Sequence, residues 1–151
     1  MIPETSANNQ PWILTVPSDC RQLGLVRAFV EGVCRSGGVG QSVIEAIVLA
    51  THEAAGNIIR HAYEGQPGAT LQIQCHLADD NVEIHLLDEG RPFDPAAFAC
   101  PDPAEVRPGG RGLFLIKSLM DEVTCQRRGE RGNTLRLVKR SVRDSPSSDI
   151  R

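Results

Sequence analysis

Two polar side chains stand one helical turn apart in THEAAGNIIRHAYEG, residues 51–65. On a helix that turns about 100° per residue, Glu53 and Asn57 fall within about 40° of each other, opposite the apolar stripe. A carboxylate and an amide placed in this way form either a solvated helix face or half of a nucleotide site. Polar residues opposite an apolar stripe are typical of a solvated face, but the small residues Ala50 and Gly56 beside them weaken that interpretation, because they would let a ligand or another structural layer approach closely.

A further carboxylate lies where an apolar strand ends. The alternating run VEIHLLD, residues 82–88, finishes at Asp88 and is followed by Glu89 and Gly90. A carboxylate at a strand end can accept a hydrogen bond from the exocyclic amine of adenine, and a nearby glycine lets the base lie close to the backbone. The same residues also suit an ordinary turn with a capping Asp.

A glycine-rich segment, RPGGRGLFLI, opens a predicted helix with Gly109, Gly110 and Gly112. Free backbone N–H groups and the helix dipole at such a start can hold phosphates, although a flexible connection into a helix has the same composition. The segment matches neither a Walker loop nor a Rossmann fingerprint, which must follow a strand. A last segment, GNTLRLV, places Thr134 at a strand start, where an ordinary hairpin also explains it.

The elements that must position these groups follow from the spacing of apolar residues. Helical spacing predicts helices over 18–36, 41–65 and 111–123. Strands are predicted over 12–16, 69–77, 82–88, 123–128 and 133–140. Sequential hairpins in this order predict an α/β two-layer sandwich, with a mostly antiparallel mixed sheet and the helices on one face.

The 151 residues suffice for one domain with a core, which we place at 12–140. Residues 1–11 are expected to be a flexible leader and 141–151 a disordered tail. A net charge of −3 and few aromatic residues argue against direct nucleic-acid binding, which favours a basic face and stacking platforms.

The five cysteines are scattered, odd in number and without a C-x-x-C pair, which indicates reduced thiols in a cytoplasm rather than disulfides or a zinc site. The N-terminal residues do not resemble a signal peptide. No apolar run approaches the roughly 20 residues that span a bilayer, so no membrane partner is expected.

Together, in this order, the four segments resemble the N, G1, G2 and G3 boxes of the GHKL (Bergerat) ATPase and kinase superfamily. The patterns are E-x-x-x-N on a helix, D-x-G after a strand, G-x-G-L at a helix start and Gly-x-Thr near the last strand. EAAGNIIRHAYEG, DEGRPFDP and GGRGLFLIKSLMDEV are similar to the RsbW-type anti-sigma factors, the serine-protein kinases of bacterial partner-switching systems. The resemblance spans nearly the whole ordered chain and implies the Bergerat ATP-binding fold.

The resemblance implies a role for each matching residue. Glu53 would be the general base or polariser for the attacking hydroxyl, and Asn57 would coordinate the Mg²⁺ that bridges the ATP phosphates. Asp88 would select adenine with support from Gly90. Thr134 would support the adenine end.

The G-x-G-L box would complete the ATP site: Gly110 and Gly112 would face the phosphates, with Leu113 closing the box. Residues 93–107 would form the ATP lid. Arg107 or Arg111 would meet the γ-phosphate, unless either is a plain surface residue. His61 is expected to be structural. Gly56 departs from the family pattern, in which Thr or Asn is commoner.

The resemblance further implies an ATP-dependent kinase that binds a sigma factor and phosphorylates a serine on a STAS-domain anti-anti-sigma factor, in a stress response. A homodimer is also an expectation from the family. The alternative is an ATP-binding regulatory switch that lacks kinase activity and controls another signalling partner.

Overall fold

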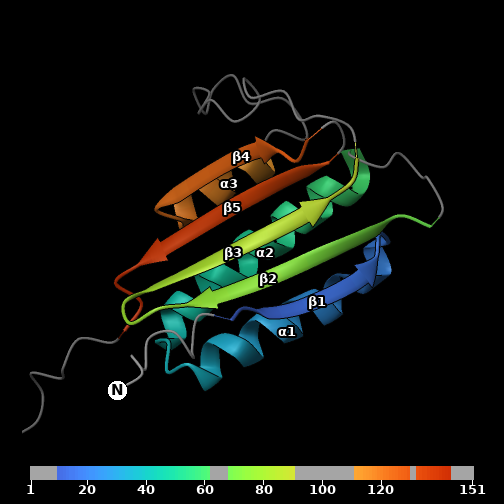
Figure 1. Cartoon of the computed structure of the whole chain (residues 1–151). Coiled ribbons are helices and arrows are strands. Elements are labelled where there is room, and N and C mark those ends of the chain that lie inside the picture. Colours follow the sequence, from blue (N-terminus) through green and yellow to red (C-terminus); the bar gives the residue numbers. More distant parts are fainter. Residues whose placement is uncertain (1–9, 62–67, 91–110, 130–131, 144–151) are drawn as a thin grey trace, which may run out of the picture.

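The computed structural model describes residues 10–61, 68–90, 111–129 and 132–143. Its strands are β1 (Trp12–Pro17), β2 (Thr70–Leu77), β3 (Asn81–Asp88), β4 (Glu122–Arg127) and β5 (Asn133–Arg140). They form one sheet in the order β1-β2-β3-β5-β4, in which all neighbouring strands are antiparallel. The helices α1 (Leu23–Ser36), α2 (Gln41–His61) and α3 (Arg111–Leu119) lie on one face of the sheet (Figure 1). The predicted α/β sandwich is confirmed, and the sheet is antiparallel throughout these residues.

Alternation along the strands decides which side chains enter the core. On β3, Val82, Ile84 and Leu86 are fully buried, whereas Glu83 and His85 between them lie on the face without helices. A fully buried aliphatic side chain stabilises the fold by about 1.5–3 kcal/mol relative to an exposed one. The other large, fully buried aliphatic side chains come from both layers: Val26, Val30, Ile47, Ile58, Leu71, Ile73, Ile116, Leu137 and Val142.

The first helix begins differently from its prediction. Asp19 caps a short 3-10 turn (Cys20–Gln22), and its Oδ1 accepts a hydrogen bond from the Arg21 backbone N–H at 2.9 Å. The α-helix proper starts only at Leu23. Asp19 therefore caps the tighter turn that precedes the helix, and the predicted helix start at residue 18 is five residues too early.

The third helix ends at Leu119, not at residue 123 as its apolar spacing predicted. Pairing with β5 overrides that spacing. The Asp121 backbone N–H donates to the Val138 carbonyl at 2.8 Å, and the Asp121 carboxylate accepts from the Arg140 backbone N–H at 2.6 Å. These bonds turn the chain into β4 directly after α3.

The described fold continues a few residues past β5. Val142 is 1% exposed, and its carbonyl accepts a hydrogen bond from the Gly40 backbone N–H at 3.0 Å. The Arg143 guanidinium donates to the Gly37 carbonyl at 2.6 Å. Residues 141–143 are therefore anchored to the connection between α1 and α2, within the segment expected to be a tail.

By length and composition alone, α2 would pass as a membrane-spanning helix, with a mean hydropathy of 1.2 over residues 41–60. Half of that stretch is buried inside the protein, as in the core helix of a soluble protein. Among the described cysteines, Cys20, Cys34, Cys75 and Cys125 are free thiols. Burial raises the pKa of Cys34 to about 11 and that of Cys75 to about 12, which keeps both thiols protonated.

Acid should destabilise the fold through Glu83 on the helix-free face. Hydrogen bonding to Arg136, and secondarily to His85, holds the pKa of Glu83 below its ordinary value of 4.5. A carboxyl whose pKa is lower in the folded state stabilises the fold above its unfolded pKa, and this contribution disappears as the pH falls through the folded value. We expect urea-denaturation midpoints to fall from about pH 5 to pH 3, and Glu83→Gln to make that decline shallower. An unchanged slope in Glu83→Gln would contradict this assignment.

Candidate nucleotide-binding site

Glu53 and Asn57 lie on α2 where the start of α3 packs against it. A Cβ built on Gly112 would stand 3.1 Å from Glu53 Oε2 and 3.2 Å from Asn57 Nδ2. A larger residue at position 112 would force one of these side chains to move, so glycine permits the close approach of the two helices. The structure brings together three of the residues that the box pattern had grouped.

Other residues of the predicted phosphate segment are described only in part. Leu113 follows Gly112 in the first turn of α3 and is half-buried. Arg111 begins α3, but its side chain, Gly110 and the predicted lid at 93–107 lie outside the described residues. The choice between Arg107 and Arg111 therefore stays a prediction, and the role of His61 does too.

Asp88 ends β3 and is only 1% exposed. Its Oδ1 accepts hydrogen bonds from the Gly90 backbone N–H at 2.8 Å and from Asn133 Nδ2 at 3.0 Å. Its Oδ2 is buried without a hydrogen-bond partner in the described part of the chain. Burial raises the pKa of Asp88, and the bonds from Asn133 and Gly90 and the charge of Arg128 oppose that shift only partly. A buried acceptor without a partner is costly, and a ligand that donates a hydrogen bond would satisfy it.

Asn133 is a site residue that the sequence interpretation missed. It is 1% exposed and pairs with Asp88 across β3 and β5, whereas Thr134 pairs with Leu87. Successive side chains of a strand point to opposite faces, so Thr134 lies on the helix-free face while Asn133 reaches Asp88. The position directly after Gly132 was the available signal, and the Gly-x-Thr pattern emphasised the next residue instead.

Gly132 allows the backbone of β5 to approach Asp88. Its φ is +95°, and a Cβ there would overlap the carbonyl oxygen of Asp88. We expect Gly132→Ala to lower the free energy of unfolding by more than the roughly 1–3 kcal/mol of a strained backbone conformation alone. Gly129→Ala is the matched control, because φ is +61° there and nothing lies within 4 Å of its Cβ. Equal losses in urea denaturation would show that the overlap with Asp88 contributes nothing.

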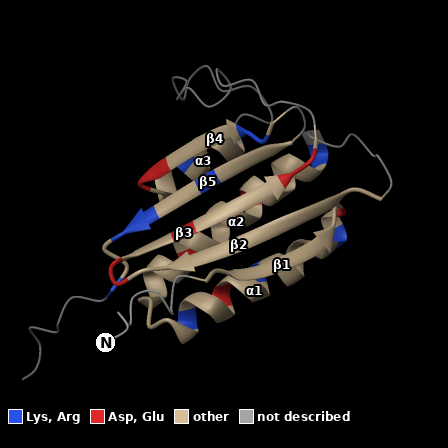
Figure 2. Ribbon diagram, viewed as in Figure 1, with Lys and Arg blue, Asp and Glu red and all other residues tan. Residues whose placement is uncertain are grey.

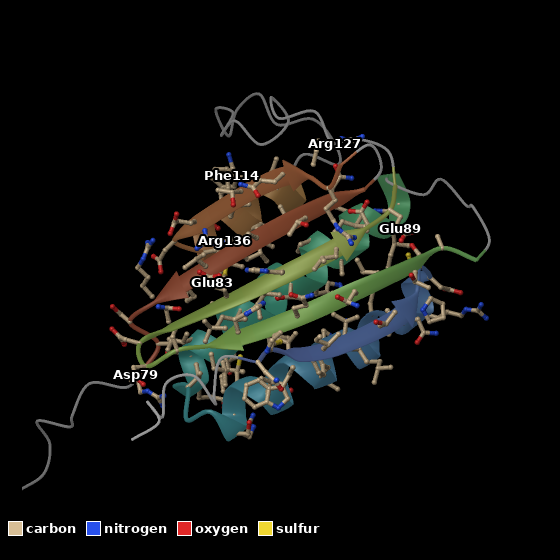
Figure 3. The ribbon with its side chains drawn as sticks, in the orientation of Figure 1. Asp79, Glu83, Glu89, Phe114, Arg127 and Arg136 are labelled. Carbon is tan, nitrogen blue, oxygen red and sulfur yellow. The ribbon has the colours of Figure 1, made fainter. Side chains whose placement is uncertain are left out.

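Both halves of the site lie at one end of the domain. The C-terminal tip of β3, which carries Asp88, lies beside the C-terminal turns of α2 (Figure 1). Acidic residues at the tip of β3 and basic residues at the ends of α2 and β4 gather there (Figure 2). Glu89 and Arg127, from the ends of β3 and β4, are labelled at the same end (Figure 3).

A groove opens beside Glu53 between α1 and α2. Its volume is about 520 Å³. It is lined by apolar and charged side chains: Arg27, Glu31, Gln41, Ile44, Glu45, Val48, Leu49, His52 and Glu53. Arg27 and His52 are hydrogen-bonded across it at 2.9 Å. Glu53 therefore borders this groove on one side, while its Oε2 lies against Gly112 of α3.

Comparison with known proteins identifies this architecture. Residues 16–139 match the family described as the histidine kinase-like ATPase domain. The chain belongs to this family. A serine-protein kinase RsbW from Halalkalibacterium halodurans is 34% identical over 145 residues, which cover 91% of this chain and 87% of that protein.

Other members of the histidine kinase-like ATPase family agree with this match. A serine-protein kinase RsbW from Staphylococcus aureus is 33% identical over 135 residues, covering 83% of this chain and 84% of that protein. A crystal structure of RsbU and RsbW domains from Mycobacterium tuberculosis has a TM-score of 0.66 at 23% sequence identity. It is aligned over 89% of this chain, which spans 33% of that longer chain, and it supports the shared fold.

The described residues of this family member fit ATP at both ends of the site. The unpaired Asp88 Oδ2 could accept a hydrogen bond from the adenine amine, and the missing side chain of Gly112 lets the start of α3 lie close against Glu53 and Asn57. The described residues include no group of three or more His, Cys, Asp or Glu side chains that could hold a metal.

Proposed function

We propose that this protein is an ATP-dependent serine-protein kinase that acts as a cytoplasmic anti-sigma factor in a bacterial partner-switching system. Its substrate would be a serine of a STAS-domain anti-anti-sigma factor. This proposal rests on one observation. Glu53, Asn57 and Gly112 lie together at the end of the domain that also holds Asp88, whose Oδ2 has no hydrogen-bond partner among the described residues. The RsbW relatives, named serine-protein kinases and aligned over most of both chains, support the same activity.

Adenine selection would rest on Asp88. Its Oδ1 is held by Asn133 and Gly90, which fixes the orientation of the carboxyl and leaves Oδ2 to accept from a ligand amine. Burial excludes water from that oxygen. A base with an acceptor in place of the adenine amine would therefore face Oδ2 acceptor to acceptor, and no water could separate the two. This arrangement favours adenine over guanine.

Phosphoryl transfer depends on positioning and charge neutralisation more than on covalent help from the protein. Bound ATP would supply the phosphoryl group, with Mg²⁺ offsetting its negative charge. Asn57 would offer its side-chain oxygen to the metal. Glu53 would orient the incoming serine hydroxyl and accept its proton, which a partly exposed carboxylate beside an open groove is placed to do.

Partner exchange tests the anti-sigma part of this proposal. The purified protein would be mixed with candidate sigma factors of its own organism in the presence of Mg²⁺ and a non-hydrolysable ATP analogue, so that no phosphate is transferred, and complexes would be measured by size-exclusion chromatography. One sigma factor should co-elute with it and be displaced by an unphosphorylated STAS-domain protein. A phosphorylated STAS-domain protein should not displace it. If no sigma factor binds while ATP does, the alternative of a switch for another partner replaces this proposal.

A further inference from the structure

Arg60 lies one helical turn after Asn57 on α2 and is exposed. Its Nη2 donates a hydrogen bond to Asn57 Oδ1 at 2.9 Å. That oxygen is the atom that Asn57 would offer to Mg²⁺. A guanidinium cation therefore lies on the oxygen assigned to the metal.

Gly56 makes room for this contact. A Cβ at position 56 would stand 3.2 Å from Arg60 Nη1, 3.5 Å from Nη2 and 3.6 Å from Cζ. The guanidinium therefore lies over the bare backbone of Gly56. The absence of a side chain at position 56 therefore leaves the space that the Arg60 guanidinium occupies.

The same contact fixes the orientation of the Asn57 amide. Oδ1 accepts the hydrogen bond from Arg60. Nδ2 is the Asn57 atom nearest to Gly112, at 3.2 Å from a Cβ built on that glycine. An amide orientation is assigned from its hydrogen bonds, and here the charged donor decides it. Arg60 thus holds Asn57 in one rotamer before any ligand binds.

We propose that Arg60 is a positioning residue that competes with Mg²⁺ for Asn57. Its guanidinium donates to Asn57 Oδ1 when no metal is bound to that oxygen. The inference rests on the proposed role of Asn57 as a metal ligand. A guanidinium and a divalent cation directed at one amide oxygen repel each other over a few ångströms. Arg60 must therefore leave Asn57 when Mg²⁺ binds, and the protein requires more Mg²⁺ than the site would need without it.

The test is a Mg²⁺ titration of the binding of a fluorescent ATP analogue, which measures binding and not turnover. Arg60→Met should lower the half-saturating Mg²⁺ concentration about 3- to 10-fold, which corresponds to the net contribution of one ordinary hydrogen bond at an exposed site. Gly56→Ala should shift it in the same direction by a smaller factor, because the new methyl group displaces the flexible guanidinium. Arg35→Met is the matched control, since Arg35 is an exposed arginine on α1 that pairs with Glu31.

An unchanged or higher Mg²⁺ requirement in Arg60→Met would overturn the inference, as would nucleotide binding that does not depend on Mg²⁺ in the unaltered protein. A different outcome would contradict the proposed kinase activity. A protein that binds the analogue with the expected Mg²⁺ shifts but transfers no phosphate would lose the proposed activity and keep this role for Arg60. Normal phosphate transfer, with the same half-saturating Mg²⁺ concentration in Arg60→Met and in the unaltered protein, would support the kinase activity and remove this role from Arg60.

Discussion

Glu53→Gln is expected to reduce the rate of phosphotransfer by about 100- to 10,000-fold, the usual contribution of a general base. The substitution preserves the size of the side chain and its contact with Gly112, where Glu53 Oε2 lies 3.1 Å from a Cβ built on that glycine. It removes the basic oxygen that would accept the serine proton. ATP affinity should therefore change little, because Glu53 is assigned no contact with adenine.

Two measurements separate these effects. Initial rates of phosphate incorporation into the STAS-domain substrate report the chemical step, and fluorescence titration with an ATP analogue reports binding. Glu122→Gln is a suitable control, because it neutralises a carboxylate on β4 that pairs with Arg140 far from Glu53. A Glu53→Gln protein with an unaltered rate would show that the proton has another acceptor. Equal losses of rate and binding would make Glu53 a structural residue.

Asp88→Asn is expected to lower ATP affinity by at least about 100-fold, because a buried polar site that loses its complementary partner discriminates strongly. The variant can still accept from Gly90 and Asn133 through its Oδ1, as Asp88 does at 2.8 and 3.0 Å. Its amide nitrogen would replace the unpaired Oδ2 and present a donor to the donor amine of adenine. Binding should fail although the local hydrogen bonds persist.

The same variant should be more stable than the unaltered protein when no nucleotide is present. Burial raises the pKa of Asp88, so its ionisation disfavours the fold. That penalty is complete above the folded pKa and disappears as the pH falls below the unfolded value. Thermal melts at pH 7.5 should show a higher midpoint for Asp88→Asn without ATP and no increase when ATP is added. An ATP-dependent increase equal to that of the unaltered protein would remove Asp88 from the adenine site.

Much of this architecture follows from local patterns in the sequence. Alternation over residues 82–88 predicted a strand, and the structure buries Val82, Ile84 and Leu86 on one face of it, as a side-chain period of two requires once one face is buried. The pairing of Glu53 with Asn57 followed from helical geometry alone. The family resemblance assigned Gly112 to the same ATP site, but its contact with Glu53 and Asn57 was not predicted, since no local rule relates residues so distant in the sequence.

The misjudged details depend on tertiary contacts. The spacing of apolar residues extended the third helix to 123, but hydrogen bonds from Asp121 to β5 end it at Leu119. The sequence predicts Asn133 as the first residue of a strand, and only the pairing of β5 with β3 places its side chain against Asp88. The contact between Arg60 and Asn57 has helical spacing, yet its significance appears only when Gly56 is seen to leave the space open.

Transfer of the γ-phosphate of ATP to a serine tests the central claim most directly. The protein, Mg²⁺ and γ-labelled ATP would be incubated with each STAS-domain protein of the same organism, and the labelled residue would be mapped by mass spectrometry. We expect one STAS-domain protein to acquire label on a single serine, and Asn57→Ala and Glu53→Gln to abolish that label. Nucleotide binding without label on any of these proteins would contradict the kinase assignment and leave an ATP-dependent switch as the function of this domain.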